Sequence, residues 1–260
     1  ALGIRIVPLT IRFGDEQFVD RRDLTPEEFW ARCAASPVLP ETAAPSPGQF
    51  EEAFREAAAA GADGIVCVNL AGKLSATVES ARVAAKALEA DLPVRVIDSQ
   101  SLTMGLGTMC ILAARRAAEG AGIDEVAAVV EDLIPRTRIF ATLDTLENLK
   151  KGGRIGGAQA FLGSMLAIKP VIEVRGGVVE QESRQRTRSR ALAYLVEKVR
   201  SFGAVENLSI VHGAAPDVEE FRTMLQAVYP GAIVVANLGP VIGTHSGPRA
   251  MGVVFHTPRR

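Results

Sequence analysis

The sequence of 260 residues lacks the combinations that build disulfide frameworks and metal sites. Its three cysteines, Cys33, Cys67 and Cys110, are far apart and form no C-x-x-C pair. Isolated cysteines with apolar neighbours are typical of reduced thiols in a protein core, so the sequence predicts a cytoplasmic protein. The three histidines include no pair at metal-ligand spacing, and we expect no zinc or other metal site.

The sequence also lacks an excess of charge and a long apolar run. Its 29 lysines and arginines nearly balance 30 aspartates and glutamates, and the formal net charge of −1 argues against a nucleic-acid partner. No apolar run approaches the ~20 residues of a transmembrane helix, which leaves at most transient membrane contact. Basic residues do gather in residues 150–154 and 184–190, a pattern typical of a solvated face or of one small anionic partner.

Motifs of common enzyme classes are missing as well. The sequence contains no GxxxxGK[ST] phosphate loop and no GxSxG nucleophile elbow. The GxG that begins at Gly105 has Cys110 at the third glycine position and no strand directly before it. The glycine-rich, basic residues 152–157 fit a phosphate cradle and a structural turn equally well. On this basis we expect no cofactor.

The apolar residues that are present alternate between a helical and a strand period. Helices are predicted at residues 49–60, 77–88, 108–118, 123–133, 145–151 and 188–202. Strands are predicted at residues 4–7, 65–68, 93–97, 139–143, 168–174, 178–181, 208–211, 233–236 and 252–255. This order predicts an α/β fold of two α/β domains, with mostly parallel sheets flanked by helices. The helix-breaking Pro135 marks the expected boundary between domains of residues 1–135 and 136–260.

Three polar side chains lie in loops, or just after strands, where sheets of this kind bind ligands. Thr42 lies in the loop of residues 40–47, Ser75 directly precedes a predicted helix, and His245 lies in residues 243–248. Taken singly, they are interpreted as a turn residue, a helix N-cap and a loop histidine. If they converge, they offer two hydroxyl donors and an imidazole to one carboxylate, supported by the N–H groups of a helix N-terminus.

Ordered segments over nearly the whole chain resemble motifs of the DegV family. They are VPL at residues 7–9, the TSxPS-like loop at 42–46, KLSAT at 73–77, LKKGGRI at 149–155, IKP at 168–170, RTR at 186–188 and HSGP at 245–248. The sequence departs from the family where Ala43 replaces a serine, Ala76 a glycine and Arg249 the last glycine of HxGPG. The family's opening DSxxDL strand is also absent, which is consistent with a chain that lacks its start.

This resemblance implies a non-enzymatic protein that binds one long-chain, palmitate-like fatty acid. Thr42 and Ser75 would hydrogen-bond the carboxylate, with His245 in the same network. The domain of residues 1–135, its first strand missing, would carry the carboxylate-binding loops. The domain of residues 136–260 would supply the His245 loop and the pocket for the acyl tail. The apolar residues 160–167 are then either the lining of that pocket or a plain core helix.

The resemblance also implies a partner. A separate ATP-using fatty acid kinase subunit would phosphorylate the presented acid for phospholipid synthesis, and Arg154 and Arg186 would lie beside the ligand or this partner. The alternative is an acyl hydrolase in which Ser75 is the nucleophile and His245 the base, with Asp98 as the candidate third member.

Overall fold

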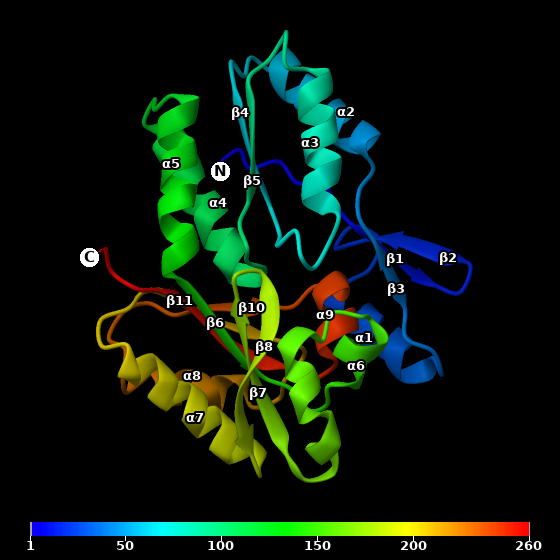
Figure 1. Ribbon diagram of the computed structural model, residues 1–260, viewed down its shortest axis with the longest axis vertical. Coiled ribbons are helices and arrows are strands. Elements are labelled where there is room, and N and C mark those ends of the chain that lie inside the picture. Colours follow the sequence, from blue (N-terminus) through cyan, green and yellow to red (C-terminus); the bar gives the residue numbers. More distant parts are fainter. Residues whose placement is uncertain (1, 260) are drawn as a thin grey trace. The chain divides into compact units, whose positions relative to one another are not determined.

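The computed structural model describes residues 2–259, apart from the side chains of residues 162–167. The chain divides into two compact units (Figure 1). The first unit comprises Ala1–Leu9 and Ala43–Pro135, and the second comprises Thr10–Thr42 and Arg136–Arg260. The division at Pro135 falls where the sequence predicted a boundary, but Thr10–Thr42 belongs to the second unit and not with the rest of residues 1–135.

The first unit is a pair of parallel strands between two layers of helices. Its elements are α2 (Pro47–Ala59), β4 (Ile65–Asn69), α3 (Thr77–Ala87), β5 (Val94–Asp98), α4 (Thr103–Ala118) and α5 (Ile123–Leu133). Val66 and Val68 pack against the cluster of α4 and α5, whereas Cys67 packs against the cluster of α2 and α3. Because both faces are covered, the strand is a continuous apolar run in the sequence. Burial also raises the pKa of the Cys67 thiol to about 11, so it is protonated at neutral pH.

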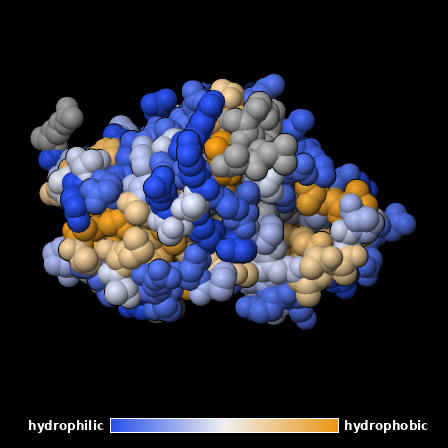
Figure 2. All heavy atoms as spheres, turned by 90° about the horizontal axis from the view of Figure 1, so that it is seen from below, coloured by the Kyte–Doolittle hydropathy of each residue, from blue (hydrophilic) through white to orange (hydrophobic). Residues whose placement is uncertain are grey.

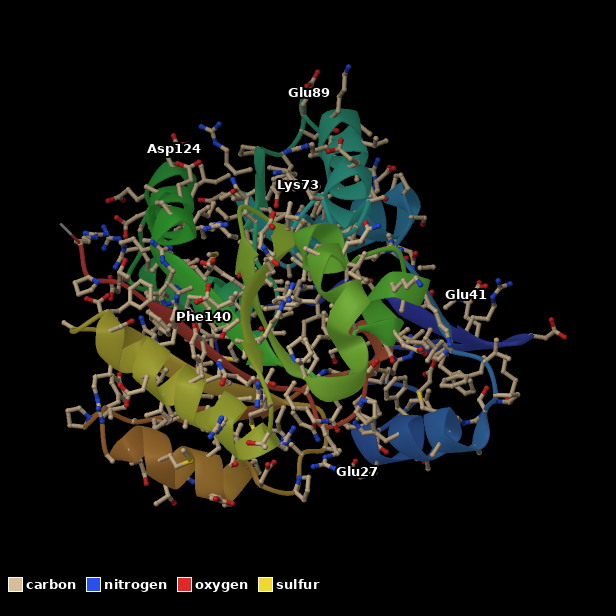
Figure 3. All side chains as sticks on the ribbon, turned by 60° about the horizontal axis from the view of Figure 1, so that its bottom comes forward. Glu27, Glu41, Lys73, Glu89, Asp124 and Phe140 are labelled. Carbon is tan, nitrogen blue, oxygen red and sulfur yellow. The ribbon has the colours of Figure 1, made fainter. Side chains whose placement is uncertain are left out.

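The second unit is built on a six-stranded sheet in the order β10-β9-β11-β6-β7-β8. Its strands are β6 (Thr137–Thr142), β7 (Lys169–Arg175), β8 (Val178–Gln185), β9 (Glu206–His212), β10 (Val234–Asn237) and β11 (Met251–His256). Helices α7 (Arg188–Ser201) and α8 (Val218–Gln226) pack their apolar faces on the sheet, where Phe140 lies buried in the core (Figure 3). The prediction of an α/β fold with flanking helices is confirmed.

The prediction of mostly parallel strands is wrong for this sheet. Among the described strands, β9 and β10 pair in parallel, and the other neighbouring pairs are antiparallel. The β7–β8 pair is the hairpin that Gly176 and Gly177 predict, and both glycines have positive φ angles of 56° and 77°. Strand β11 runs antiparallel between β6 and β9, although β6 and β11 are distant in the sequence. The order of helices and strands along the sequence does not predict that the last strand, β11, inserts between β6 and β9.

The segment Thr10–Thr42 contains elements that the sequence pattern did not predict. They are β1 (Thr10–Phe13), β2 (Glu16–Val19), α1 (Pro26–Ala35) and β3 (Glu41–Ala43). A capping box between Thr25 and Glu28 begins α1. Phe29 and Trp30 of this helix pack so closely on Gly243 of α9 (Pro240–Ser246) that a Cβ there would lie 2.7 Å from the Phe29 ring. This aromatic contact explains why the segment lies with the second unit.

The predicted strand at residues 4–7 is wrong, since none of these residues is in a strand. Ile6 is 79% exposed, and Val7 instead packs against the core of α2 and α3. The remaining short elements, η1 (Ile134–Arg136), α6 (Glu147–Lys151) and η2 (Gly156–Ala167), connect the larger ones. None of the described helices is long and apolar enough to cross a membrane. The face seen in Figure 2 is largely hydrophilic, with apolar residues in separate patches.

Candidate functional site

His245 lies in the last turn of α9, a short helix at a position where the sequence predicts a loop. Pro240 occupies the first turn, where its missing N–H costs nothing, and the Thr244 hydroxyl donates back to the Pro240 carbonyl at 2.9 Å. The helix ends at Gly247, whose φ of 75° favours glycine. The imidazole is thereby attached to a defined helical turn and not to a mobile loop.

Thr42 and His245 are 203 residues apart in the sequence and meet side chain to side chain. The Thr42 Oγ1 lies 3.0 Å from the His245 Nε2, a hydrogen-bond distance. Strand β3 positions the threonine, and both residues belong to the second unit. Two of the three predicted site residues therefore form one polar pair.

The imidazole of His245 is held in its neutral form. Burial, and secondarily the nearby positive charge of Arg154, lowers its pKa from 6.5 to about 4. Its Nδ1 is buried and has no hydrogen-bond partner among the described residues. At neutral pH the ring therefore carries one proton, and its one hydrogen-bonded nitrogen is Nε2.

A turn after α6 closes over the same ring. The Asn148 side chain donates to the Thr244 carbonyl at 2.9 Å, which fixes α6 against α9. A Cβ added at Gly152 would overlap the His245 Nδ1 and lie 2.9 Å from Cε1. Gly152 thus lies at the site, whereas the sequence predicted only that it belongs to a phosphate cradle or a structural turn. The available signal was the doubled glycine, because one glycine, Gly153 with its φ of 69°, is enough to end the helix.

Ser75, the third predicted residue, belongs to the first unit. Its Oγ lies 2.8 Å from the Thr77 Oγ1 and accepts from the Thr77 backbone N–H at 3.4 Å. The N-cap of α3 is Ala76, so the interpretation of Ser75 as that cap is off by one residue. The meeting of Ser75 with Thr42 and His245 at one carboxylate stays a prediction.

Two further hydroxyls, which the sequence did not indicate as site residues, follow strand β5: Ser101 lies in the loop after it and Thr103 begins α4. The backbone N–H of Ala71 donates to the Ser101 carbonyl at 2.8 Å, which brings the loop after β5 beside the loop that carries Ser75. The hydroxyls of Ser101 and Thr103 are buried without a partner among the described residues. The first unit thus gathers hydroxyl groups at the carboxyl ends of its parallel strands, as the sheet topology predicts.

The hydrolase alternative is not supported. Its candidate third member, Asp98, uses its Oδ1 to accept from the backbone N–H groups of Gly72 at 3.1 Å and Gln100 at 2.8 Å. A triad also needs a carboxylate at the Nδ1 of the histidine, but Gly152 occupies the space beside the His245 Nδ1.

The two arginines named from the sequence are exposed side chains of the second unit. Arg154 donates to the Gly152 carbonyl at 2.6 Å, and its charge acts on His245. Arg186 lies between β8 and α7, just before Thr187, the N-cap of α7. Their contact with a ligand or partner stays a prediction. The side chains of residues 162–167, most of the predicted tail-pocket segment, lie outside the described residues.

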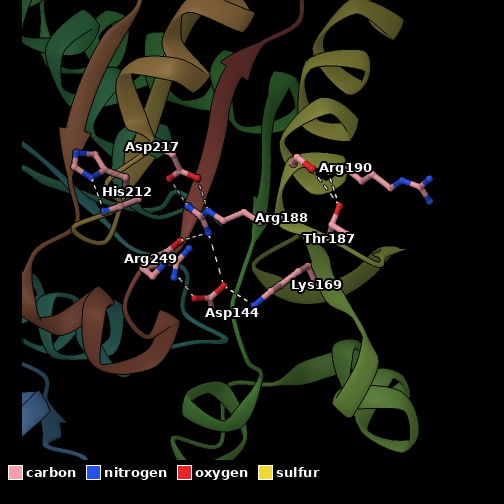
Figure 4. Close-up of polar contacts among 10 residues, drawn as sticks. Asp144, Lys169, Thr187, Arg188, Arg190, His212, Asp217 and Arg249 are labelled. Atoms are coloured by element: carbon pink, nitrogen blue, oxygen red, sulfur yellow. Dashed lines mark hydrogen bonds and ion pairs between the residues drawn. The ribbon is translucent and has the colours of Figure 1, made fainter.

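A network of ion pairs between side chains anchors the segment that follows His245 (Figure 4). Arg188 donates to both carboxylate oxygens of Asp217, at 2.5 and 2.7 Å, and to the backbone carbonyl of Arg249 at 2.8 Å. Asp144 accepts from Lys169 at 2.8 Å and lies 3.4 Å from Arg249. Arg249 has a φ of 60°, a left-handed conformation that favours glycine. No group of three or more potential metal-binding side chains is found among the described residues.

Comparisons of this chain with known protein families, sequences and structures all find members of one family. The family model described as "Uncharacterised protein, DegV family" matches residues 1–257. A DegV domain-containing protein of Streptomyces coelicolor is 39% identical over 258 residues, covering 97% of this chain and 90% of that protein. A structure described as fatty acid binding of a DegV family protein from Thermus thermophilus superposes with a TM-score of 0.90 at 32% identity, covering 99% of this chain and 93% of that chain. A stearic acid-binding protein from Eubacterium ventriosum has a TM-score of 0.86 at 26% identity, covering 98% and 92%.

Proposed function

This chain belongs to the DegV family, and from that premise we propose that it binds one long-chain fatty acid by its carboxylate and buries the acyl tail. The proposal is supported by the fatty acid binding described for the similar structures from Thermus thermophilus and Eubacterium ventriosum. Within this chain, the observation that carries it is the hydrogen-bonded pair of Thr42 and His245.

Binding a fatty acid in a buried site requires hydrogen-bond donors for its carboxylate, and the Thr42–His245 pair supplies one of them. Burying about 14 methylenes at roughly 0.8 kcal/mol each gives a gross gain on the order of 10 kcal/mol. A buried carboxylate without partners costs roughly 5 kcal/mol, so its donors have to be in place before the ligand binds. Thr42 is held by His245, and Ser75 contributes the second hydroxyl from the loop before α3.

In the complete proposal the protein is a carrier and performs no chemistry of its own. A separate ATP-using fatty acid kinase transfers the γ-phosphoryl group of ATP to the presented carboxylate, so that ADP leaves and an acyl phosphate is formed. The acyl phosphate then enters phospholipid synthesis in the cytoplasm. Arg154 and Arg186 are the cations proposed to face the ligand or the kinase, and both are exposed.

Native mass spectrometry of the protein purified from bacteria tests the proposal. We expect a co-purified mass equal to one long-chain fatty acid, reduced in a Thr42→Val variant. Thr223→Val is a matched control, since the Thr223 hydroxyl is exposed on α8 and bonds the Glu219 carbonyl of its own helix. Protein that carries no lipid and takes up none from added fatty acids would refute the carrier function.

A further inference from the structure

The backbone conformation of residue 152 does not require a glycine. Gly152 has φ −76° and ψ −5°, an ordinary right-handed conformation that any residue adopts. Its neighbour Gly153 is the residue with a positive φ. What requires a glycine at position 152 is the imidazole of His245, because an added Cβ would overlap Nδ1 and lie 3.1 Å from the Asn148 carbonyl oxygen.

This contact leaves the two ring nitrogens of His245 in different surroundings. Nε2 has the Thr42 hydroxyl as a partner, which can donate or accept. Nδ1 is buried against Gly152 without a hydrogen-bond partner among the described residues. A hydrogen on Nδ1 would point at the Gly152 methylene and lose a hydrogen bond, whereas a lone pair there makes a weak favourable C–H contact.

We propose that Gly152 is a positioning residue that holds His245 as the Nε2–H tautomer and thereby makes Thr42 a hydrogen-bond donor to the ligand. Nε2–H donates to the Thr42 Oγ1, which leaves the threonine hydrogen free to point away from the ring. Arg154, whose guanidinium is held at the Gly152 carbonyl, opposes a second proton on the ring.

The tautomer of His245 decides which ligand headgroup Thr42 can bind. This inference rests on the proposed function. With Nε2–H, Thr42 offers a hydrogen to an oxygen that only accepts, as in an ionised carboxylate. With the opposite tautomer, Thr42 would donate to Nε2 and present only lone pairs, which repel a carboxylate. The site should therefore select a fatty acid anion over a fatty amine of equal chain length, whose ammonium group has no lone pair to accept the Thr42 hydrogen.

The first test needs no ligand. Long-range ¹H–¹⁵N correlation spectra of ligand-free protein with ¹⁵N-labelled histidine, at neutral pH, report which ring nitrogen carries the proton. We expect the Nε2–H pattern for His245. A pattern of Nδ1–H, or an average of both tautomers, would overturn the assignment whatever the protein binds.

The second test compares two glycine substitutions of the same kind. Gly152→Ala should displace the ring, remove the tautomer preference and weaken fatty acid binding about tenfold, the equivalent of one neutral hydrogen bond. Gly122→Ala is the matched control, because Gly122 has φ −72° and nothing within 4 Å of an added Cβ. An unchanged His245 spectrum in a folded Gly152→Ala variant contradicts the positioning role.

The third test is a competition between a fatty acid and the fatty amine of the same length, which carries an ammonium group at neutral pH. We expect the acid to bind about a hundredfold more tightly to the wild-type protein, and this ratio to shrink in Gly152→Ala. Equal affinity for acid and amine would refute the donor role of Thr42. Binding of neither would refute the carrier function while leaving the measured tautomer of His245 standing, so the two failures are distinguishable.

Discussion

The hydroxyl clusters of the two units differ in how their hydrogen bonds are directed. In the second unit Thr42 is paired with an imidazole that Gly152 holds on its other side. In the first unit Ser75 is paired with the Thr77 hydroxyl, and either oxygen can donate. A ring nitrogen with one assigned proton gives the threonine a fixed polarity, whereas two hydroxyls can exchange roles. Thr42 should therefore be sensitive to changes that Ser75 tolerates.

The largest expected effect comes from the ion-pair network of Arg188, Asp217 and Asp144 in the second unit. Arg188→Ala leaves the carboxylates of Asp217 and Asp144 without their shared partner, in a site where the Arg188 side chain is 13% exposed. We expect the free energy of unfolding to fall by about 3 kcal/mol in urea denaturation. Arg188→Lys should recover part of this loss, and Arg190→Ala, on the exposed side of the same helical turn, should change stability by less than about 0.5 kcal/mol. Equal losses for Arg188→Ala and Arg190→Ala would show that the network does not support the fold.

The next effect is a dependence of stability on pH that His245 confers on the second cluster. Its folded pKa of about 4 lies below the ordinary 6.5, so the unfolded state binds more protons between these values. Stability is therefore complete above about pH 6.5 and falls towards pH 4, by roughly 2 kcal/mol after allowance for the partial exposure of the ring.

Denaturation at a series of pH values checks this window. Burial lowers the pKa of His212 in the same direction, so the comparison is between the wild type and His245→Gln. In the variant, the free energy of unfolding should depend less steeply on pH between about 4 and 6.5, because only the contribution of His245 is lost and that of His212 remains. Identical pH profiles would mean that His245 is not held neutral by its surroundings.

The two hydroxyls can be compared directly by ligand affinity. Thr42→Val removes the donor with fixed polarity and should weaken fatty acid binding by about 2 kcal/mol, measured by displacement of a fluorescent fatty acid. Ser75→Ala should cost about 1 kcal/mol or less, because the Thr77 hydroxyl lies 2.8 Å away and can take over the contact. A larger loss for Ser75→Ala than for Thr42→Val would reverse the comparison drawn between the clusters.

The smallest effect concerns the loop after His245. Arg249→Gly removes a side chain from a backbone with φ 60° and gives up an exposed ion pair with Asp144. We expect a net gain in stability of about 0.5 kcal/mol, since relief of the left-handed conformation exceeds the value of such a pair. A clear loss of stability in thermal unfolding would assign the Arg249 side chain a larger role in the network.

Local elements could be predicted well, and the reason is visible in α5. Its predicted residues 123–133 agree with Ile123–Leu133 because a regular apolar stripe faces one core. The β7–β8 hairpin likewise follows from Gly176 and Gly177. Helix α1 was not predicted, although the sequence contains its capping box. Its aromatic side chains pack on Gly243, which is distant in the sequence, so no local apolar pattern indicated the helix. The role of Gly152 could not be predicted either, because its partner lies on a different helix.

By itself, the sequence determined the class of fold, most of the helices and strands, and the family to which the chain belongs, because periodicity and short motifs are local properties of the chain. Only the tertiary structure decided that β11 inserts antiparallel between β6 and β9, that Thr10–Thr42 lies with the second unit, and that Thr42 reaches His245. These outcomes depend on which surfaces far apart in the chain bury each other, and packing of that kind leaves no periodic trace in the sequence.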